Sequence, residues 1–284
     1  MTIENVVVIG AGTMGSGIAY VIAGSGRNVT IVDTEQSFLD KGIKRIKHKI
    51  RDGIERNKMT PAEGEKLSKR FKTSVDLAEA TKSADLVIEA VFENMEVKKQ
   101  IFNTLSDNAK ADAILASNTS TLSVVEMASV VENPDRVLGL HFFNPAEAMK
   151  LVEVIYGENT ADQYMQHAYE FIISIGKTPI KVKNSPGFVV NRLLVPMLNE
   201  AVKLLDEGVA SKEDIDQAAV LGSGFPAGPF VLADMSGLDV ALASMRTFEK
   251  ELGSCYTPSP TLVKLVEEGK LGMKTGEGFY KYSS

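Results

Sequence analysis

Residues 6–15 read VVVIGAGTMG and decide how the first half of this chain folds. Four β-branched apolar residues, Val6–Ile9, form a continuous run that is typical of a buried parallel strand. The glycines that follow predict a tight turn into a helix. Gly10 suits the turn, Gly12 lets backbone approach a pyrophosphate, and Gly15 lets helix and strand pack closely. The helix N-terminus would then face the phosphates, which indicates a dinucleotide-binding unit.

A second apolar run ends in an acidic residue at the spacing that such a unit requires. Val29–Val32 predicts the next strand, and Asp33 follows it directly. An aspartate there accepts hydrogen bonds from the adenosine ribose and repels a 2′-phosphate, so NAD is favoured as the cofactor, while use of NADP stays open. The alternative is a glycine turn without a ligand. Strand, turn, helix and acid together disfavour that alternative.

A histidine and a glutamate lie in two strand-like runs within Leu138–Tyr156, LGLHFFNPAEAMKLVEVIY. His141 ends the first run. In the second run, Glu153 shares one face with Leu151 and Ile155 by period-two alternation. An ionised group on an apolar face is costly unless it is paired, so Glu153 needs a donor, and the imidazole of His141 is a candidate. On these residues alone, a solvated carboxylate at the strand rim is an equal alternative.

The composition indicates an ordinary globular chain with enough length for two cores. It has 284 residues, of which 44% are hydrophobic and 24% charged, and a formal net charge of -6. The acidic balance argues against a dedicated nucleic-acid binder. The single cysteine, Cys255, excludes an intrachain disulfide and any cysteine metal cluster, and we predict no metal site. No apolar run is long enough for a membrane span, and the first strand starts too early for a signal peptide, so we expect a cytoplasmic protein.

A basic amphipathic helix is predicted over residues 40–58, DKGIKRIKHKIRDGIERNK. Its basic face stands out in an acidic protein and favours docking of a polyanionic group, although a merely solvated face is the commoner explanation. Thr60–Glu63 predicts a capping box at the start of another helix, which gives a helical hairpin after the second strand. His48 and His167 are expected on the surface. The apolar stripe of the basic helix consists of Ile43, Ile46, Ile50 and Ile54.

Two further strand ends carry polar residues. Asp85–Val91 predicts a strand that runs out near Glu93, ahead of a helix that carries Lys98. The next run leads into Ser117–Thr121, which is crowded with hydroxyl and amide groups. Residues at the carboxyl ends of parallel strands line the ligand crevice, so at least one member of this cluster should point at the site. Capping of the following helix is the alternative.

The second part of the chain is expected to be all-helical. The strand pattern ends after Asn184–Gly187, and we place the domains at residues 1–186 and 187–284. The fold class is therefore α/β with a helical hairpin insertion, followed by an all-α domain. Pro196 should bend or start the first long helix, Ser211 should cap another, and Leu238–Leu252 should form a further one. Because such a small helical domain buries little surface alone, association with a second copy is expected.

Taken together, five sets of residues resemble the L-3-hydroxyacyl-CoA dehydrogenase family from end to end. Within that family, the chain is most similar to the bacterial 3-hydroxybutyryl-CoA dehydrogenases. The resemblance implies a Rossmann-type domain with a helical hairpin, a helical domain that forms a homodimer, and hydride transfer between NAD(P) and 3-hydroxyacyl-CoA. The residues are Gly10–Gly15, Ser117–Ser120, His141–Pro145, Glu153 and Pro186–Arg192.

The resemblance also implies roles for individual residues. His141 would be the general acid and base, Glu153 would orient it, and Ser120 and Asn191 would contact the reacting oxygen and the substrate. The acyl-CoA phosphates would bind the basic helix, with Arg51, Arg56 and Lys58 as candidates. The implied cofactor contacts are Gly10, Gly12, Gly15, Asp33, Glu93, Lys98, Asn118 and Asn144.

Two rival functions stay open at this point. An L-gulonate-type 3-hydroxyacid dehydrogenase shares the motifs but binds no coenzyme A. The basic helix, which favours docking of a polyanionic group, disfavours this rival. A non-catalytic dinucleotide-binding protein, like the lens crystallins that resemble this family, is the other rival. The presence of Ser120, His141, Glu153 and Asn191 together disfavours it.

Overall fold

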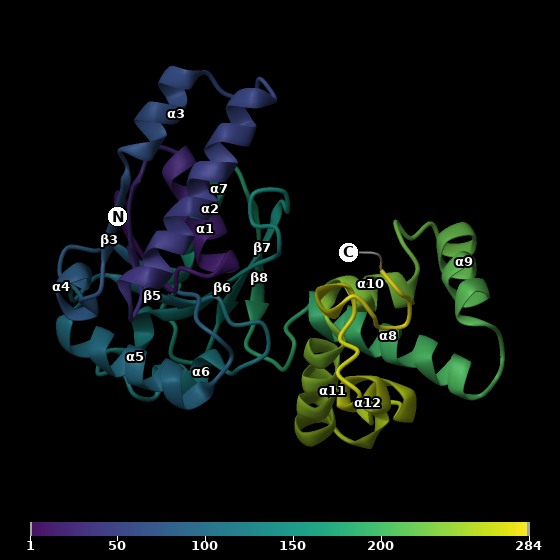
Figure 1. Ribbon diagram of the computed structural model, residues 1–284. Helices are drawn as coiled ribbons and strands as arrows, with labels where there is room; N and C mark the ends of the chain where they lie inside the picture. The colour runs from purple at the N-terminus through teal and green to yellow at the C-terminus, as the bar shows by residue number, and fades with distance from the viewer. Residues whose placement is uncertain (1, 283–284) are drawn as a thin grey trace. The chain divides into compact units, whose positions relative to one another are not determined.

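The chain divides into two compact units, Met1–Ser185 and Pro186–Ser284 (Figure 1). The computed structural model describes residues 2–282. The first unit is an α/β sandwich and the second is helical. The fold class predicted from sequence is confirmed, and the break between the units follows Ser185.

One eight-stranded sheet forms the centre of the first unit, in the order β3-β2-β1-β4-β5-β6-β7-β8. All neighbouring strands are parallel except β6 and β7, which run antiparallel. The reversal at β6 and β7 places His141 directly opposite Glu153. The strands are β1 (Asn5–Ile9), β2 (Asn28–Val32), β3 (Phe71–Ser74), β4 (Leu86–Glu89), β5 (Ile114–Ser117), β6 (Val137–Phe142), β7 (Leu151–Tyr156) and β8 (Thr178–Lys183).

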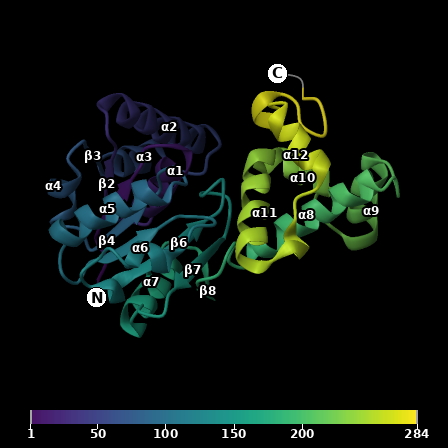
Figure 2. The same cartoon turned by 90° about the horizontal axis from the view of Figure 1, so that it is seen from below.

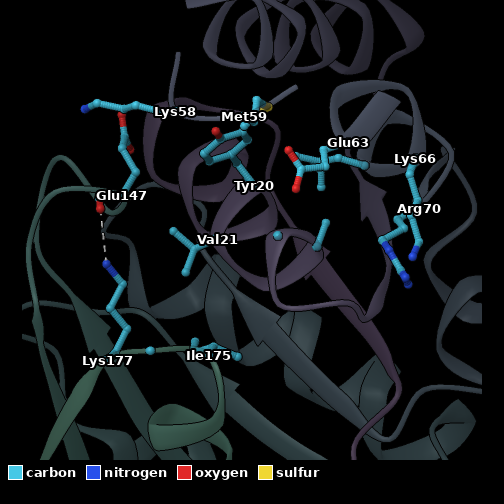
Figure 3. A pocket seen from close by; sticks show the side chains of 14 residues that line it. Tyr20, Val21, Lys58, Met59, Glu63, Lys66, Arg70, Glu147, Ile175 and Lys177 are labelled. Atoms are coloured by element: carbon cyan, nitrogen blue, oxygen red, sulfur yellow. Dashed lines mark hydrogen bonds between the residues drawn. The ribbon is translucent and has the colours of Figure 1, made fainter. Parts of the chain in front are cut away.

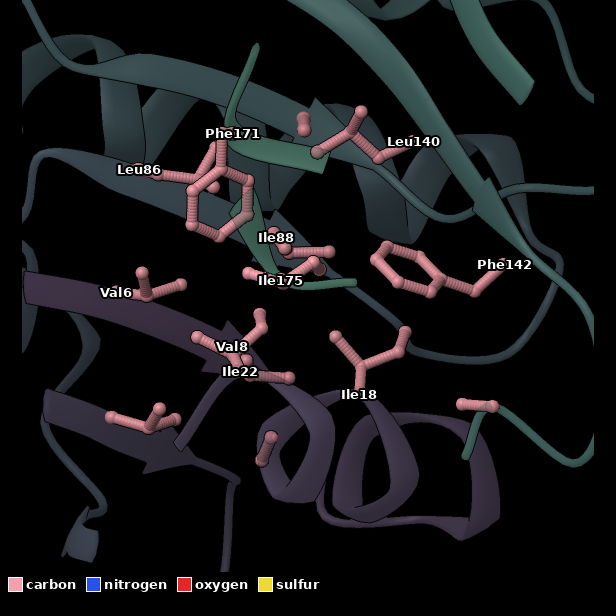
Figure 4. Close-up of a cluster of buried hydrophobic side chains, with 14 of the residues drawn as sticks. Val6, Val8, Ile18, Ile22, Leu86, Ile88, Leu140, Phe142, Phe171 and Ile175 are labelled. Atoms are coloured by element: carbon pink, nitrogen blue, oxygen red, sulfur yellow. The ribbon is translucent and has the colours of Figure 1, made fainter. Parts of the chain in front are cut away.

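Helices cover both faces of this sheet (Figures 1 and 2). One face packs against α1 (Thr13–Gly24) and α7 (Asp162–Ser174), where Ile18, Ile22 and Phe171 meet side chains from β1, β4 and β6 (Figure 4). Every second residue of a strand points to this face, as the pleat requires. The other helices of the unit are α2 (Gln36–Glu55), α3 (Pro61–Ser68), α4 (Leu77–Thr81), α5 (Met95–Asn108) and α6 (Val124–Ala128), with a 3-10 turn at Pro134–Arg136.

The helical hairpin predicted after the second strand is present as α2 and α3. Ile46 and Ile50 of α2 are buried, so the isoleucine stripe faces the core. Thr60 and Glu63 form the predicted capping box, in which each side chain bonds the other residue's backbone N–H. His48 is exposed as expected, whereas His167 on α7 is half-buried.

The second unit consists of five helices within the described residues. Ser211 caps α9 by accepting a hydrogen bond from the Asp214 backbone, as predicted. Pro196 lies inside α8 and does not start it, because the helix begins at Val190. Two buried carboxylates, Asp216 and Asp234, hold the C-terminal segment by bonding Tyr280 and its neighbours. The helices are α8 (Val190–Asp206), α9 (Lys212–Ser223), α10 (Pro229–Ser236), α11 (Leu238–Leu252) and α12 (Pro260–Glu267), with 3-10 turns at Ser254–Tyr256 and Met273–Thr275.

Candidate active site

The glycine turn after β1 is packed tightly on two sides and open on a third. Gly10 has a φ of 102°, and a Cβ there would lie 2.6 Å from the Ala90 carbonyl oxygen. A Cβ on Gly15 would lie 1.8 Å from the Gly10 carbonyl oxygen, so no larger residue fits at either position. A Cβ on Gly12, in contrast, would meet nothing within 4 Å. The turn therefore leaves an open approach to the N-terminus of α1, where anions bind.

A pocket of about 600 Å³ lies beside this turn. Its lining includes Gly10, Gly12 and Asp33 as well as the apolar residues Phe38, Val91 and Ile101. An apolar lining with a few polar groups suits a nucleoside with its phosphates. The pocket and the open glycine turn thus fit the adenosine end of a dinucleotide.

Asp33 also supports the turn itself. Its Oδ2 accepts a hydrogen bond from the Ala11 backbone N–H at 2.7 Å, and its Oδ1 accepts one from the Thr34 backbone N–H at 2.8 Å. The carboxylate is therefore fixed at the edge of the pocket, and part of its hydrogen-bonding capacity is already used by the protein.

His141 and Glu153 form a buried pair on the neighbouring strands β6 and β7. The Nδ1 atom of His141 lies 2.7 Å from Glu153 Oε2. Glu153 has an exposed fraction of 0% and His141 one of 5%, so Glu153 is not a solvated carboxylate at the strand rim. A carboxylate only accepts hydrogen bonds, so Nδ1 carries the hydrogen and Nε2 is the basic nitrogen of the neutral ring. The ring of Phe143 contacts the imidazole with centroids 4.4 Å apart.

The polar cluster at the end of β5 connects three strand ends. Asn118 Oδ1 accepts a hydrogen bond from the Phe142 backbone N–H at 2.8 Å, next to His141. The backbone N–H and hydroxyl of Ser120 both donate to Glu93 Oε1, at 2.6 and 2.9 Å. The cap of α6 comes from Ser123, which lies outside this cluster. The predicted residues Glu93, Asn118 and Ser120 therefore gather near the end of β6.

Lys98 is buried beneath this cluster, with an exposed fraction of 1%. Its ammonium group donates to both carboxylate oxygens of Glu89, at 2.7 and 2.8 Å, and lies 3.4 Å from Glu93. Glu89 is absent from the site residues predicted by sequence. The signal was the one that singles out Glu153, a carboxylate in an apolar strand, because Glu89 ends the run Leu86–Glu89.

The loop between β6 and β7 is held from two sides. Lys177 donates to the carbonyl oxygens of Ala146 and Met149, both at 2.7 Å, and burial lowers the pKa of Lys177. Lys49 on α2 forms an ion pair with Glu147. Asn144, predicted to contact the cofactor, is exposed in this loop.

The three basic residues proposed for phosphate contacts lie near the end of α2 and just after it. Arg51 contacts His48 and Glu55 on its own helix. Arg56 follows the end of α2, and Lys58 lines a cavity of about 540 Å³ (Figure 3). In that cavity, Lys58 and Arg70 lie at opposite sides, so their charges do not converge on one point.

Another basic concavity, of about 310 Å³, lies on α2. Lys41, Lys44, Arg45 and His48 line it. These residues were not predicted individually, although the excess of positive charge on this helix was the signal.

Asn191 lies in the second unit, in the first turn of α8. Among residues 2–282, no group of three or more histidine, cysteine, aspartate or glutamate side chains is arranged to hold a metal ion. None of the helices in that range is both long and apolar enough to cross a membrane.

Comparisons with known proteins agree with this geometry. Residues 5–185 match the NAD-binding domain of 3-hydroxyacyl-CoA dehydrogenase, and residues 187–282 match its C-terminal domain. A 3-hydroxybutyryl-CoA dehydrogenase of Clostridioides difficile is 44% identical over 97% of this chain and 98% of its own. The human mitochondrial hydroxyacyl-coenzyme A dehydrogenase is 44% identical over 99% of this chain and 91% of its own.

A solved structure extends the likeness to three dimensions. The crystal structure of (S)-3-hydroxybutyryl-CoA dehydrogenase from Ralstonia eutropha superimposes with a TM-score of 0.96 at 42% identity, covering 100% of both chains. With an NAD-binding glycine turn, a buried histidine and glutamate pair, and both family domains matched along their length, this chain belongs to the 3-hydroxyacyl-CoA dehydrogenase family.

Proposed function

We propose that this enzyme interconverts (S)-3-hydroxybutyryl-CoA and acetoacetyl-CoA with NAD as the redox partner. The observation that carries the proposal is the buried pair of His141 and Glu153 at 2.7 Å, beside strand ends that also carry Asn118 and Ser120. The names of the Clostridioides difficile relative and of the Ralstonia eutropha structure support the choice of substrate.

The cofactor would bind along the carboxyl ends of the strands. Gly12 and the start of α1 would hold the pyrophosphate, and Asp33 would read the ribose. Gly10 and Gly15 would shape the turn, while Glu93, Lys98, Asn118 and Asn144 would contact the rest of the molecule. When bound, the nicotinamide supplies or accepts the hydride. The open space at Gly12 and the pocket of about 600 Å³ support this placement.

His141 would move the proton of the reacting oxygen. In the oxidation direction, its Nε2 takes the proton of the substrate hydroxyl, and the ring becomes an imidazolium. Glu153 stabilises that cation through the Nδ1 hydrogen bond. In the reduction direction, the imidazolium returns the proton to the developing alkoxide. The Ser120 hydroxyl would turn its one hydrogen from Glu93 to the substrate oxygen, and Asn191 would help to hold that oxygen in place.

The phosphates of coenzyme A would bind the basic side of α2. Arg51, Arg56 and Lys58 remain our candidates, and the concavity lined by Lys44 and Arg45 adds further cations. Arg45 also donates to the Ala11 carbonyl oxygen, which places positive charge beside the glycine turn. Several cations on one helix suit a ligand with three phosphate groups.

We also propose that the second unit, residues 187–284, binds substrate and joins two copies of the chain into a homodimer. Large apolar side chains are exposed on it, and contact with a second copy would cover such side chains. A cytoplasmic location agrees with the single free thiol of Cys255. The exposed apolar residues include Leu193, Val209, Leu221, Met235 and Val240.

The test is turnover of acetoacetyl-CoA with NADH, followed by loss of the reduced nicotinamide's absorbance. We expect turnover by the wild-type enzyme and loss of most of it in His141→Gln, with NADH binding nearly intact, because general acid catalysis contributes about 10²- to 10⁴-fold. Unchanged turnover in the variant would disprove the role of His141. Activity on gulonate with none on acetoacetyl-CoA would favour the gulonate-type rival, and NADH binding without turnover of either would favour a non-catalytic binder.

A further inference from the structure

We propose that Glu89 is a positioning residue for the reaction, which acts through Lys98 and Glu93 on the hydroxyl of Ser120. The inference rests on the proposed function, in which Ser120 contacts the reacting oxygen. Glu89 itself touches neither substrate nor cofactor in this scheme. Its effect reaches the site through hydrogen bonds between buried groups.

Glu89 is the most enclosed carboxylate at the end of a parallel strand. Its exposed fraction is 0%, and both of its oxygens accept from the Lys98 ammonium. Oε2 also accepts from the Ser117 hydroxyl at 2.6 Å, and Oε1 accepts from the Val91 backbone N–H at 2.7 Å. The carboxylate therefore fixes the ends of β4 and β5 and the first turns of α5 at one point.

Lys98 connects Glu89 to Glu93. Its ammonium lies 2.7 Å from Glu89 and 3.4 Å from Glu93, so it is shared between two carboxylates and held mainly by the buried one. Glu93 in turn accepts hydrogen bonds from the Ser120 backbone and hydroxyl. The place of the Ser120 hydroxyl thus depends on where Lys98 holds Glu93.

Ser117 provides a second connection between Glu89 and the same loop. Its hydroxyl donates to Glu89 and accepts from the Thr119 backbone N–H at 3.1 Å. The Thr119 hydroxyl then donates to Glu93 at 2.9 Å. Two routes from Glu89 therefore end at the Glu93 carboxylate. Lys98 lies near its Oε2, and Thr119 donates to its Oε1, which also accepts from Ser120.

Stability alone is a poor reason for this arrangement. A fully buried ion pair is costly to desolvate, and apolar residues of similar volume often serve a fold as well or better. A chain of charged hydrogen bonds that ends on a hydroxyl beside the reacting oxygen gives geometric precision, which apolar packing does not supply.

The test is a double-mutant cycle of Glu89→Gln with Ser120→Ala. Glutamine keeps the size of Glu89 and removes its charge, while alanine removes only the Ser120 hydroxyl and leaves its backbone bond to Glu93. We expect each single variant to lower kcat about tenfold or more. In the Ser120→Ala background, adding Glu89→Gln should lower kcat by less than about threefold further. The matched control is Lys99→Met, which breaks the exposed ion pair with Glu126 one residue further along α5 and should leave kcat unchanged.

Several outcomes would overturn the inference. Multiplicative losses in the cycle would mean that Glu89 and Ser120 act independently. A rise in the Kd for NADH with unchanged kcat would mean that Glu89 acts only on the cofactor pocket, through Val91. Glu89→Asp, which keeps the charge but shortens the reach, replaces Glu89→Gln in the cycle if the latter does not fold. A wild-type enzyme inactive on acetoacetyl-CoA would refute the proposed function instead, so the two failures are distinct.

Discussion

Replacing Glu153 by glutamine should slow catalysis without unfolding the protein. In the structure, Glu153 accepts the Nδ1 hydrogen of His141 at 2.7 Å and is fully buried. A glutamine has the same shape but no charge, and its amide group can donate to Nδ1. Donation to Nδ1 would move the ring hydrogen to Nε2, the nitrogen that must accept the substrate proton. The buried imidazolium would also lose its counter-charge.

The size of the effect follows from the strength of that one bond. A hydrogen bond to a charged group contributes about 1.5 to 3 kcal/mol, and each 1.4 kcal/mol corresponds to a factor of ten in rate. The pair becomes most strongly charged when the imidazolium forms, so this energy belongs to the transition state more than to the bound substrate. We therefore expect kcat to fall about 10- to 150-fold, with KM nearly unchanged.

The assay is steady-state turnover in both directions, together with the Kd for NADH and the melting temperature. Glu158→Gln is a matched control, because Glu158 is an exposed carboxylate just after β7. A loss of less than about threefold in Glu153→Gln, with the fold intact, would refute the role of Glu153 as the partner of the catalytic histidine. An equal loss in the control would show that the assay responds to charge on this strand in general.

Two other changes test the cofactor specificity and the stability of the sheet. Asp33→Ala should narrow the preference for NAD over NADP in kcat/KM, because the carboxylate that repels a 2′-phosphate is removed, and an unchanged ratio would contradict that role. Asp85→Asn should lower the free energy of unfolding at pH 7 by about 1 to 3 kcal/mol, because Asp85 accepts from the Lys110 ammonium and from the backbone of Asn5. Burial raises the pKa of Asp85, but these donors outweigh it and hold the pKa below its ordinary value of 3.8. The difference in the free energy of unfolding between variant and wild type should therefore be complete above pH 3.8. It should disappear as the pH falls through the lower pKa of the folded protein. An equal difference at pH 7 and pH 2, measured by denaturant unfolding, would count against this account.

The sequence predicted those features that depend on residues near one another in the chain. The glycine turn, the capping box at Thr60 and the isoleucine stripe of α2 each depend on residues within a few positions of one another, so their pattern alone predicts them. Pro196 was expected to bend or start the long helix, and it lies inside α8, which begins at Val190.

The site was harder to predict because its pairs come from separate strands. His141 and Glu153 are 12 residues apart, and only the antiparallel register of β6 with β7 puts them opposite each other. Glu89 and Lys98 meet because a strand and the helix after it converge at one edge of the sheet. Periodicity shows that a carboxylate lies in an apolar row, but it does not show which cation reaches it.

Glu153 and Glu89 have similar surroundings in this sheet. Each carboxylate is fully buried within a strand, and each bonds a nitrogen group, that of His141 in one case and that of Lys98 in the other. Because a buried charge is costly unless it is paired, each acid holds its partner strongly in one place. His141 and Lys98, which we propose to contact ligands, are thus each held by a carboxylate that does not contact a ligand. Removing either acid should therefore alter the rate more than the binding of NADH, and this is the common expectation that the two variants, Glu153→Gln and Glu89→Gln, put to the test.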